Sequence, residues 1–68
     1  EYLSEVIDKT IHYQPINIHY CSFKGKEQDV ILHPYYVKQY NNRWFVFGYN
    51  EKYQNLSVYA LDRIQELK

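Results

Sequence analysis

The spacing of hydrophobic residues changes from a helical period to a strand period near Pro15. An apolar stripe at helical spacing is formed by Leu3, Val6, Ile7 and Ile11. This pattern predicts an amphipathic helix over about residues 2–12. Gln14-Pro15 ends it, because a proline disfavours a helical residue immediately before it.

From Ile16 onward, apolar residues occupy every second position, which is typical of strands. Ile16, Ile18 and Tyr20 share one face of the first strand, and Asn17, His19 and Cys21 share the other. The later strands are expected at Asp29–Tyr40, Arg43–Tyr49 and Leu56–Leu61, with Ile64–Leu67 as a fifth strand or a turn of helix. The breaks between them are Lys24-Gly25-Lys26, Asn41-Asn42, the polar loop Asn50–Asn55, and Asp62-Arg63.

Pro34 lies inside the second expected strand. Proline has no N–H to donate to a sheet ladder, so this point is expected to be an edge, a bulge or a bend.

One helix followed by a meander of four or five antiparallel strands places the chain in the mainly β class. We expect a small Sm-like (SH3-like) antiparallel β-barrel of about five strands over residues 15–67, since closure removes exposed sheet edges. The 68 residues form one domain, residues 1–68. The chain begins without Met and inside the expected helix, so we expect it to come from a longer protein.

The small size of the domain is offset by its aromatic content. A domain of this length buries only about 60% of the surface that its unfolded chain exposes. Nine Tyr, three Phe and one Trp make up 19% of the residues, and each ring can bury ~150–250 Å².

Global charge points to no particular partner, because eight basic and eight acidic side chains cancel. The single cysteine, Cys21, excludes an internal disulfide and fits a reducing compartment. The sequence has no apolar run long enough to span a membrane and no leading signal peptide. We therefore expect a cytoplasmic location and no membrane partner.

Residues for catalysis or metal binding are not arranged in any recognisable pattern. His12, His19 and His33 lack the spacing of a zinc site. Cys21 is interpreted as a small apolar filler, the carboxylates form no close pair, and the two glycines are far apart. We expect no enzymatic activity, no metal site and no cofactor.

The window between His33 and Asn50 contains no acidic residue but holds Lys38 and Arg43. Its seven aromatic residues are Tyr35, Tyr36, Tyr40, Trp44, Phe45, Phe47 and Tyr49. Such a composition suits single-stranded nucleic acid or nucleotides, because bases stack on rings while cations contact phosphates. The alternative is that these rings fill the core, since strands favour aromatic residues.

Alternation divides this window into two sets. Trp44, Val46 and Gly48 share one face of their strand, whereas Phe45, Phe47 and Tyr49 share the other. One set is expected in the core and the other at least partly at the surface.

Four segments together resemble the WYL domain family over essentially the whole chain. In chain order they are Ile18-His19-Tyr20, His33-Pro34-Tyr35-Tyr36-Val37, Asn42-Arg43-Trp44-Phe45-Val46-Phe47-Gly48 and Ala60-Leu61-Asp62-Arg63-Ile64. WYL domains are similar to Sm-like barrels and occur mostly in bacterial transcription regulators, behind a helix-turn-helix. The resemblance implies a ligand-sensing domain for single-stranded DNA or RNA, or a nucleotide, which modulates that DNA-binding domain.

The resemblance also implies a set of ligand-binding residues. Tyr20 and Trp44 would stack on the ligand or hydrogen-bond to it, and Arg63 would contact phosphate in a bidentate manner. His33 and Tyr35 flank Pro34 and would line the same groove. Other interpretations stay open: Tyr20 and Trp44 as packing residues, and Arg63 paired with an acid (Asp62, Glu1, Glu5 or Asp8).

Three positions depart from the family pattern. Phe45 replaces the Tyr of the family motif and lacks its hydroxyl, and Val46 replaces Leu conservatively. Val30 stands where many members have an Arg, four residues before Pro34, which lowers the positive charge of the expected pocket.

Two hypotheses follow. In the first, the domain senses a ligand, and Tyr20, Trp44 and Arg63 converge on one exposed groove. In the second, it is a structural or dimerisation module without its own ligand, and these three residues are buried or mutually satisfied. In the second case the domain holds a homodimer or docks against other domains of its own regulator.

Overall fold

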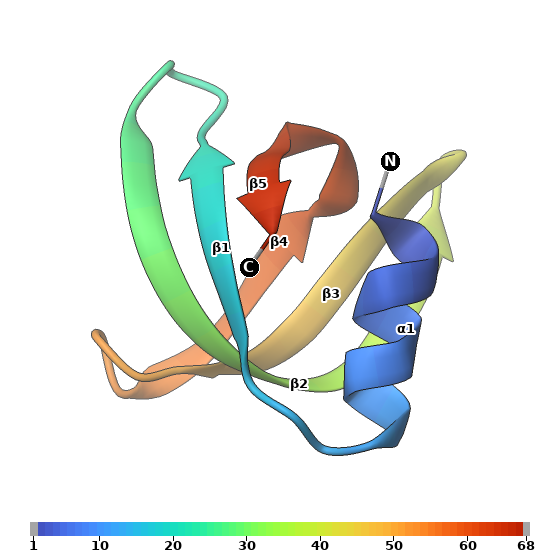
Figure 1. The fold of residues 1–68 in the computed structure, drawn as a ribbon. Coiled ribbons are helices and arrows are strands. Elements are labelled where there is room, and N and C mark those ends of the chain that lie inside the picture. The colour runs from blue at the N-terminus through green and yellow to red at the C-terminus, as the bar shows by residue number, and fades with distance from the viewer. Residues whose placement is uncertain (1, 68) are drawn as a thin grey trace.

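The computed structural model describes residues 2–67, which form one strongly curved sheet and one helix (Figure 1). The elements are α1 (Leu3–Ile11), β1 (Ile16–Cys21), β2 (Glu27–Tyr40), β3 (Arg43–Asn50), β4 (Asn55–Ala60), the 3-10 helix η1 (Leu61–Arg63) and β5 (Ile64–Leu67). Every strand pair is antiparallel. The mainly β class with one N-terminal helix is therefore confirmed.

Helix α1 lies beside the sheet and buries one position completely. Val6 is in the core and Leu3 packs against it as the apolar stripe predicts, whereas Ile7 and Ile11 of the same stripe are exposed. The helix ends where Tyr13 adopts a left-handed conformation (φ 55°) and Gln14 N donates to Lys9 O at 2.9 Å. Nothing helical within residues 2–67 has the length and apolar character required to cross a bilayer.

The Asn41-Asn42 turn fixes the register between β2 and β3. Both residues have positive φ (50° and 61°), the conformation of the two-residue hairpin turns that match strand twist. Tyr40 and Arg43 form the closing pair of this hairpin.

A bulge in β2 bends the sheet at Pro34. The register with β3 shifts between Pro34 and Tyr36, which confirms one of the outcomes expected for a proline here. Gly48 is paired with Pro34, and a Cβ at Gly48 would clash with the carbonyl oxygen of His33 and lie 2.9 Å from Pro34 Cα. The missing side chain thus permits a close approach of the two strands.

The core lies on the concave face of the curved sheet. Its buried hydrophobic cluster consists of Val6, Ile16, Ile18, Tyr20, Val30, Leu32, Val46, Tyr59, Leu61 and Ile64. In β3 the buried positions are Val46, Gly48 and Asn50, while Phe45, Phe47 and Tyr49 are half-buried. Trp44, on the same face as Val46, is half-buried and packs against the core. The division of β3 into a core side and a partly exposed side is confirmed.

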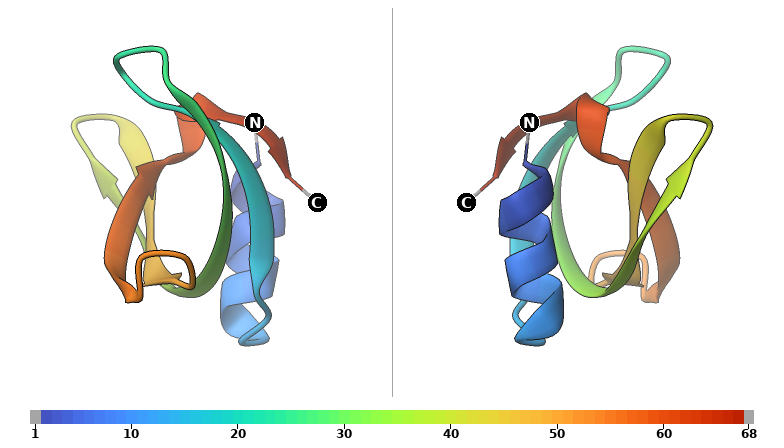
Figure 2. Two further views of the ribbon diagram at one scale, coloured as in Figure 1. Left: turned by 90° about the vertical axis from the view of Figure 1, so that its left-hand side faces the viewer. Right: turned by 90° about the vertical axis from the view of Figure 1, so that its right-hand side faces the viewer.

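The expected closed barrel is not found, because the sheet remains open. Its strand order is β4-β3-β2-β1-β5, so β4 and β5 are unpaired edges (Figure 2). Side chains fill the gap instead: the rings of Tyr20 and Tyr59 pack edge-to-face with centroids 4.8 Å apart, and Ala60 N donates to Tyr20 Oη at 3.3 Å. The 3-10 helix η1 leads from β4 into β5, and β5 pairs with β1 and not with β4. No hydrogen-bonded ladder therefore closes the sheet.

One polar residue, Asn50, is completely buried within the described structure, and both polar atoms of its side chain have hydrogen-bond partners. Its Nδ2 donates to Tyr59 Oη at 2.7 Å, and its Oδ1 accepts from the backbone amides of Lys52 (2.9 Å) and Tyr53 (3.1 Å). Burial raises the pKa of the Tyr59 hydroxyl. Asn50 therefore ties the β3–β4 turn to the core.

Candidate functional site

Tyr20 faces the core and not the solvent. Only 9% of its surface is exposed, its ring packs on Tyr59, and its hydroxyl accepts the Ala60 amide. The packing interpretation accounts for all of these contacts.

His33 and Tyr35 lie on either side of Pro34 in β2. The Nε2 of His33 is 2.6 Å from Glu51 Oε2, so the imidazole is already engaged by a carboxylate. Tyr35 is 56% exposed beside the bulge and is accessible to a ligand.

Trp44 is half-buried and packs against the edge of the core. It lies on the face of β3 that also carries Val46, and with Tyr35 it lines a groove of about 270 Å³ beside α1. Tyr35 and Trp44 are the two predicted residues that the structure brings together.

Arg63 is half-buried at the end of η1, with its guanidinium 5.2 Å from the ring centroid of Phe23. It makes no ion pair with any residue from 2 to 67, and Glu1 lies outside the described residues. Asp62 is instead held by Arg43 through two hydrogen bonds of 2.7 Å, which lower the pKa of the Asp62 carboxyl.

The five predicted residues therefore do not converge on one groove in the described structure. Their roles as ligand contacts stay predictions. The structure points to a different surface as the best candidate site.

The outer side of β2, β3 and β4 carries a continuous set of aromatic and apolar side chains, here called the aromatic face. Its members are Tyr36, Lys38, Tyr40, Phe45, Phe47, Leu56 and Val58. Cross-strand partners project to the same side of an antiparallel sheet. The register pairs Tyr36 with Phe47, Lys38 with Phe45, and Phe47 with Val58.

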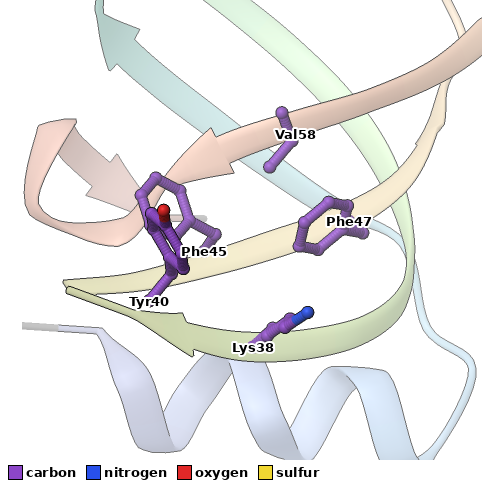
Figure 3. A pocket seen from close by; sticks show the side chains of 5 residues that line it. All are labelled: Lys38, Tyr40, Phe45, Phe47 and Val58. Carbon is purple, nitrogen blue, oxygen red and sulfur yellow. The ribbon is translucent and has the colours of Figure 1, made fainter. Parts of the chain in front are cut away.

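Two open depressions lie next to each other on the aromatic face. The first, of about 310 Å³, is lined by residues from three strands: Lys38 and Tyr40 of β2, Phe45 and Phe47 of β3, and Val58 of β4 (Figure 3). The second, of about 260 Å³, lies beside Tyr36 and Leu56. Phe47 and Val58 line both, so the two depressions form one extended surface.

The two tyrosine rings on this face are exposed, and one pair of rings is already stacked. Tyr36 and Tyr40 are 53% and 64% exposed. Tyr36 stacks on Phe47 with centroids 4.6 Å apart and planes 8° apart. At the end of the face, the guanidinium of Arg43 lies 5.4 Å from the centroid of Phe45.

Lys38 is the cation on this face that is not committed to a carboxylate. Arg43 is bound to Asp62, whereas within residues 2–67 Lys38 has no acidic group at ion-pair distance. Flat rings beside an ammonium group suit a planar aromatic ligand that carries a negative charge.

Sequence alternation alone misassigns the β2 part of this face. Val30, Leu32 and Pro34 are buried, so strict alternation would place Tyr36 and Lys38 inside with them. After the bulge, the residues of β2 that would face the core face outward and the others face inward. Val37 therefore points inward, opposite Val46. The proline was the available signal for this reversal.

A cluster of polar side chains lies on the outer side of β1 and β2, apart from the aromatic face. His19 Nδ1 is 2.8 Å from Asp29 Oδ1, and its Nε2 is 2.7 Å from Glu27 Oε1. Hydrogen bonds to Asp29 and then to Glu27 raise the pKa of His19. Across residues 2–67, no three His, Cys, Asp or Glu side chains are grouped so as to hold a metal ion.

Comparison with known proteins gives a matching family and structural neighbours. The family model described as WYL domain matches residues 1–68. Proteasome accessory factor B/C (PafBC) of Arthrobacter aurescens superposes with a TM-score of 0.89 at 13% sequence identity, covering 97% of this chain and 10% of that chain. At this identity the likeness concerns the fold alone, and the chain spans about a tenth of that relative's length. No match was found among curated proteins.

Proposed function

This chain belongs to the WYL domain family, and from that membership we propose that it is a ligand-sensing regulatory domain of a longer bacterial transcriptional regulator. Its ligand is single-stranded nucleic acid or a nucleotide, which it binds in the cytoplasm without catalysing a reaction. Its partner is a helix-turn-helix DNA-binding domain elsewhere in the longer protein.

The observation that carries this proposal is the aromatic face with its uncommitted Lys38. Each base stacked on an aromatic side chain contributes ~1–3 kcal/mol to binding. Tyr40 and the Tyr36–Phe47 stack offer exposed rings, and Lys38 lies between them to contact phosphate. The site takes unpaired bases, because paired bases in a duplex do not present their faces.

Sensing requires that the ligand favour one arrangement of the longer protein over another. A ligand shifts such an equilibrium only by its difference in affinity for the two states. In this proposal the ligand fills the aromatic face in one state, and the DNA-binding domain covers that face in the other.

Fluorescence anisotropy with a labelled oligothymidylate, titrated at several salt concentrations, tests this proposal. Tyr40→Ala is expected to weaken binding about fivefold or more, the loss of one stacked base. Lys38→Ala is expected to lower the slope of log K against log salt by about 0.7, the loss of one phosphate contact.

Tyr13→Ala and Arg63→Ala are the matched controls. Tyr13 is 88% exposed but lies after α1, away from the aromatic face, so its removal should leave the affinity unchanged. If Arg63→Ala lost binding and Tyr40→Ala did not, the ligand site would be assigned to η1 and not to the aromatic face. Undetectable binding by the folded chain at low salt would refute the nucleic-acid ligand.

A structural module without a ligand is the second candidate. The observation that favours it is the burial of Tyr20 and the packing of Trp44 against the core, since the family resemblance assigned both to ligand contact. In that case the parent chain and every variant above bind the oligothymidylate equally weakly.

A further inference from the structure

The two free edges of the sheet are protected to different extents. β5 has only four residues, carries Glu66, and its Gln65 carbonyl accepts from the Tyr2 hydroxyl at 3.3 Å. β4 has six residues, Asn55–Ala60, with no charge, proline or bulge. Charges, prolines and bulges are the usual devices that stop edges from pairing with other chains. The β4 edge has none of them.

The backbone groups that face out from β4 can be identified from the Ala60 hydrogen bond. In an antiparallel pair, successive residues direct their N–H and C=O alternately toward the partner strand and away from it. Ala60 N donates to Tyr20 Oη and therefore points away from β3. By this alternation, the N–H and C=O groups of Leu56 and Val58 also point outward.

The outward groups at Leu56 and Val58 are the open part of this edge. The hydroxyl of Tyr20 accepts from the amide of Ala60, but within residues 2–67 no strand pairs with the outer edge of β4, the edge away from β3. The side chains of the same two residues are 72% and 50% exposed. Unpaired donors, unpaired acceptors and exposed apolar side chains thus coincide on one short segment.

We propose that β4 pairs antiparallel with β4 of a second copy of this chain, around a two-fold axis at Ser57. Leu56 then lies opposite Val58 of the second copy, and Val58 opposite its Leu56. Each of these two pairs exchanges both N–H···O bonds, which gives four hydrogen bonds across the axis. The apolar side chains meet in the same pairs.

A second copy fits this edge because the segment is self-complementary. A two-fold contact sets the same strand against itself, and a strand without charges meets no like charge there. β5 would bring its own Glu66 into such a contact. Figure 2 shows β4 on the side of the molecule opposite α1, so the helix does not block the approach.

This pairing is independent of the proposed ligand and compatible with it. The second copy extends the sheet in its own plane and leaves the aromatic face uncovered. Two aromatic faces then form one longer surface that continues through Leu56 and Val58.

Single-cysteine cross-linking tests the register. In a Cys21→Ser background, Ser57→Cys places two thiols across the axis in a non-hydrogen-bonded pair, where the Cα atoms are about 4.5 Å apart, within the range of a disulfide. Asn55→Cys is the matched control, because Asn55 would lie opposite Tyr59 of the second copy. Covalent dimers are expected from Ser57→Cys only; equal yields, or none from either variant, would overturn the proposal.

Sedimentation equilibrium of the unmodified chain and of Val58→Pro tests the edge itself, without any oligonucleotide. Proline removes an outward N–H and no bond to β3, so the dissociation constant of the dimer should rise about tenfold or more. Tyr13→Ala, at an exposed residue that follows α1 and lies away from β4, should dimerise as before. If Val58→Pro does not fold by circular dichroism, Val58→Lys replaces it. A chain that stays monomeric up to about 1 mM, or a dimer unaffected in the folded edge variant, contradicts the pairing.

Discussion

The outer surface of the sheet is polar in one half and aromatic in the other. Along β1 and the beginning of β2, His19 lies between Glu27 and Asp29. Beyond the bulge at Pro34, the outward positions carry exposed tyrosines and half-buried phenylalanines. Strand alternation builds both halves, so their difference is one of residue choice and not of fold.

The comparison teaches where recognition is concentrated. Polar side chains at outward positions are well solvated and form their own ion pairs, so the polar half needs no partner. A contiguous exposed apolar surface marks an interaction site in most soluble proteins. The aromatic half, with Lys38 and the open β4 edge beside it, is therefore the side to which we assign both proposed interactions.

Gly48→Ala should have the largest effect on the stability of the fold, because Gly48 lies at the boundary between the polar and the aromatic half. The added methyl group would clash with the His33 carbonyl, and the backbone around Pro34 would have to move. We expect a loss of about 3 kcal/mol in the free energy of unfolding, at the upper end for overpacking. Urea denaturation followed by circular dichroism measures it.

Gly25→Ala is the control for this change. Gly25 has φ +81°, but a Cβ added there would meet no atom within 4 Å. Alanine should therefore cost only the strain of a left-handed backbone, about 1 kcal/mol or slightly more. Equal losses at both positions would show that the close approach at Pro34 does not hold the two halves together.

Val46→Ala and Val58→Ala should separate the core from the aromatic face by the same chemical change. Val46 is completely buried, whereas Val58 is 50% exposed. Removing two buried methyl groups and leaving a cavity is expected to cost about 2 kcal/mol at Val46. The loss at Val58 should be about 0.5 kcal/mol or less, as for most surface changes.

Urea unfolding of both variants under identical conditions gives the comparison. If Val58→Ala destabilised the chain as much as Val46→Ala, the aromatic face would be part of the core. Its assignment as a binding surface would then be wrong.

Most of the fold followed from local signals in the sequence. Helical spacing up to Ile11 predicts α1, Asn41-Asn42 predicts the β2–β3 turn, and the alternation around Val46 predicts which side of β3 is inside. Each of these depends on neighbours within a few residues, which is why a single sequence suffices.

Closure of the barrel and the position of the site could not be obtained in this way. The gap between the edge strands depends on how Tyr20 and Tyr59 pack across residues distant in the chain. The aromatic face depends on the bulge at Pro34, after which the inward and outward positions of β2 are exchanged. A strict period of two cannot predict this exchange. Family resemblance located Tyr20 and Trp44 as motif residues, but packing explains their contacts equally well.

The smallest expected effect is a pH dependence of stability that belongs to the polar half. Asp29 and Glu27 raise the pKa of His19 above its ordinary value of 6.5 in the folded chain. A group whose pKa is higher when folded stabilises the fold most below its unfolded pKa. This contribution should therefore be present below about pH 6.5 and disappear as the pH rises through the folded value.

Urea unfolding between pH 5.5 and 8.5 (roughly one unit below and two above the ordinary histidine pKa) should detect the change as a small fall in the free energy of unfolding. His19→Gln should flatten this part of the pH profile, because the charge that titrates is removed while the side chain can still donate to a carboxylate. Oligonucleotide binding by His19→Gln should equal that of the parent chain, since the cluster lies outside the aromatic face. A loss of binding in this variant would mean that the polar half also contacts the ligand.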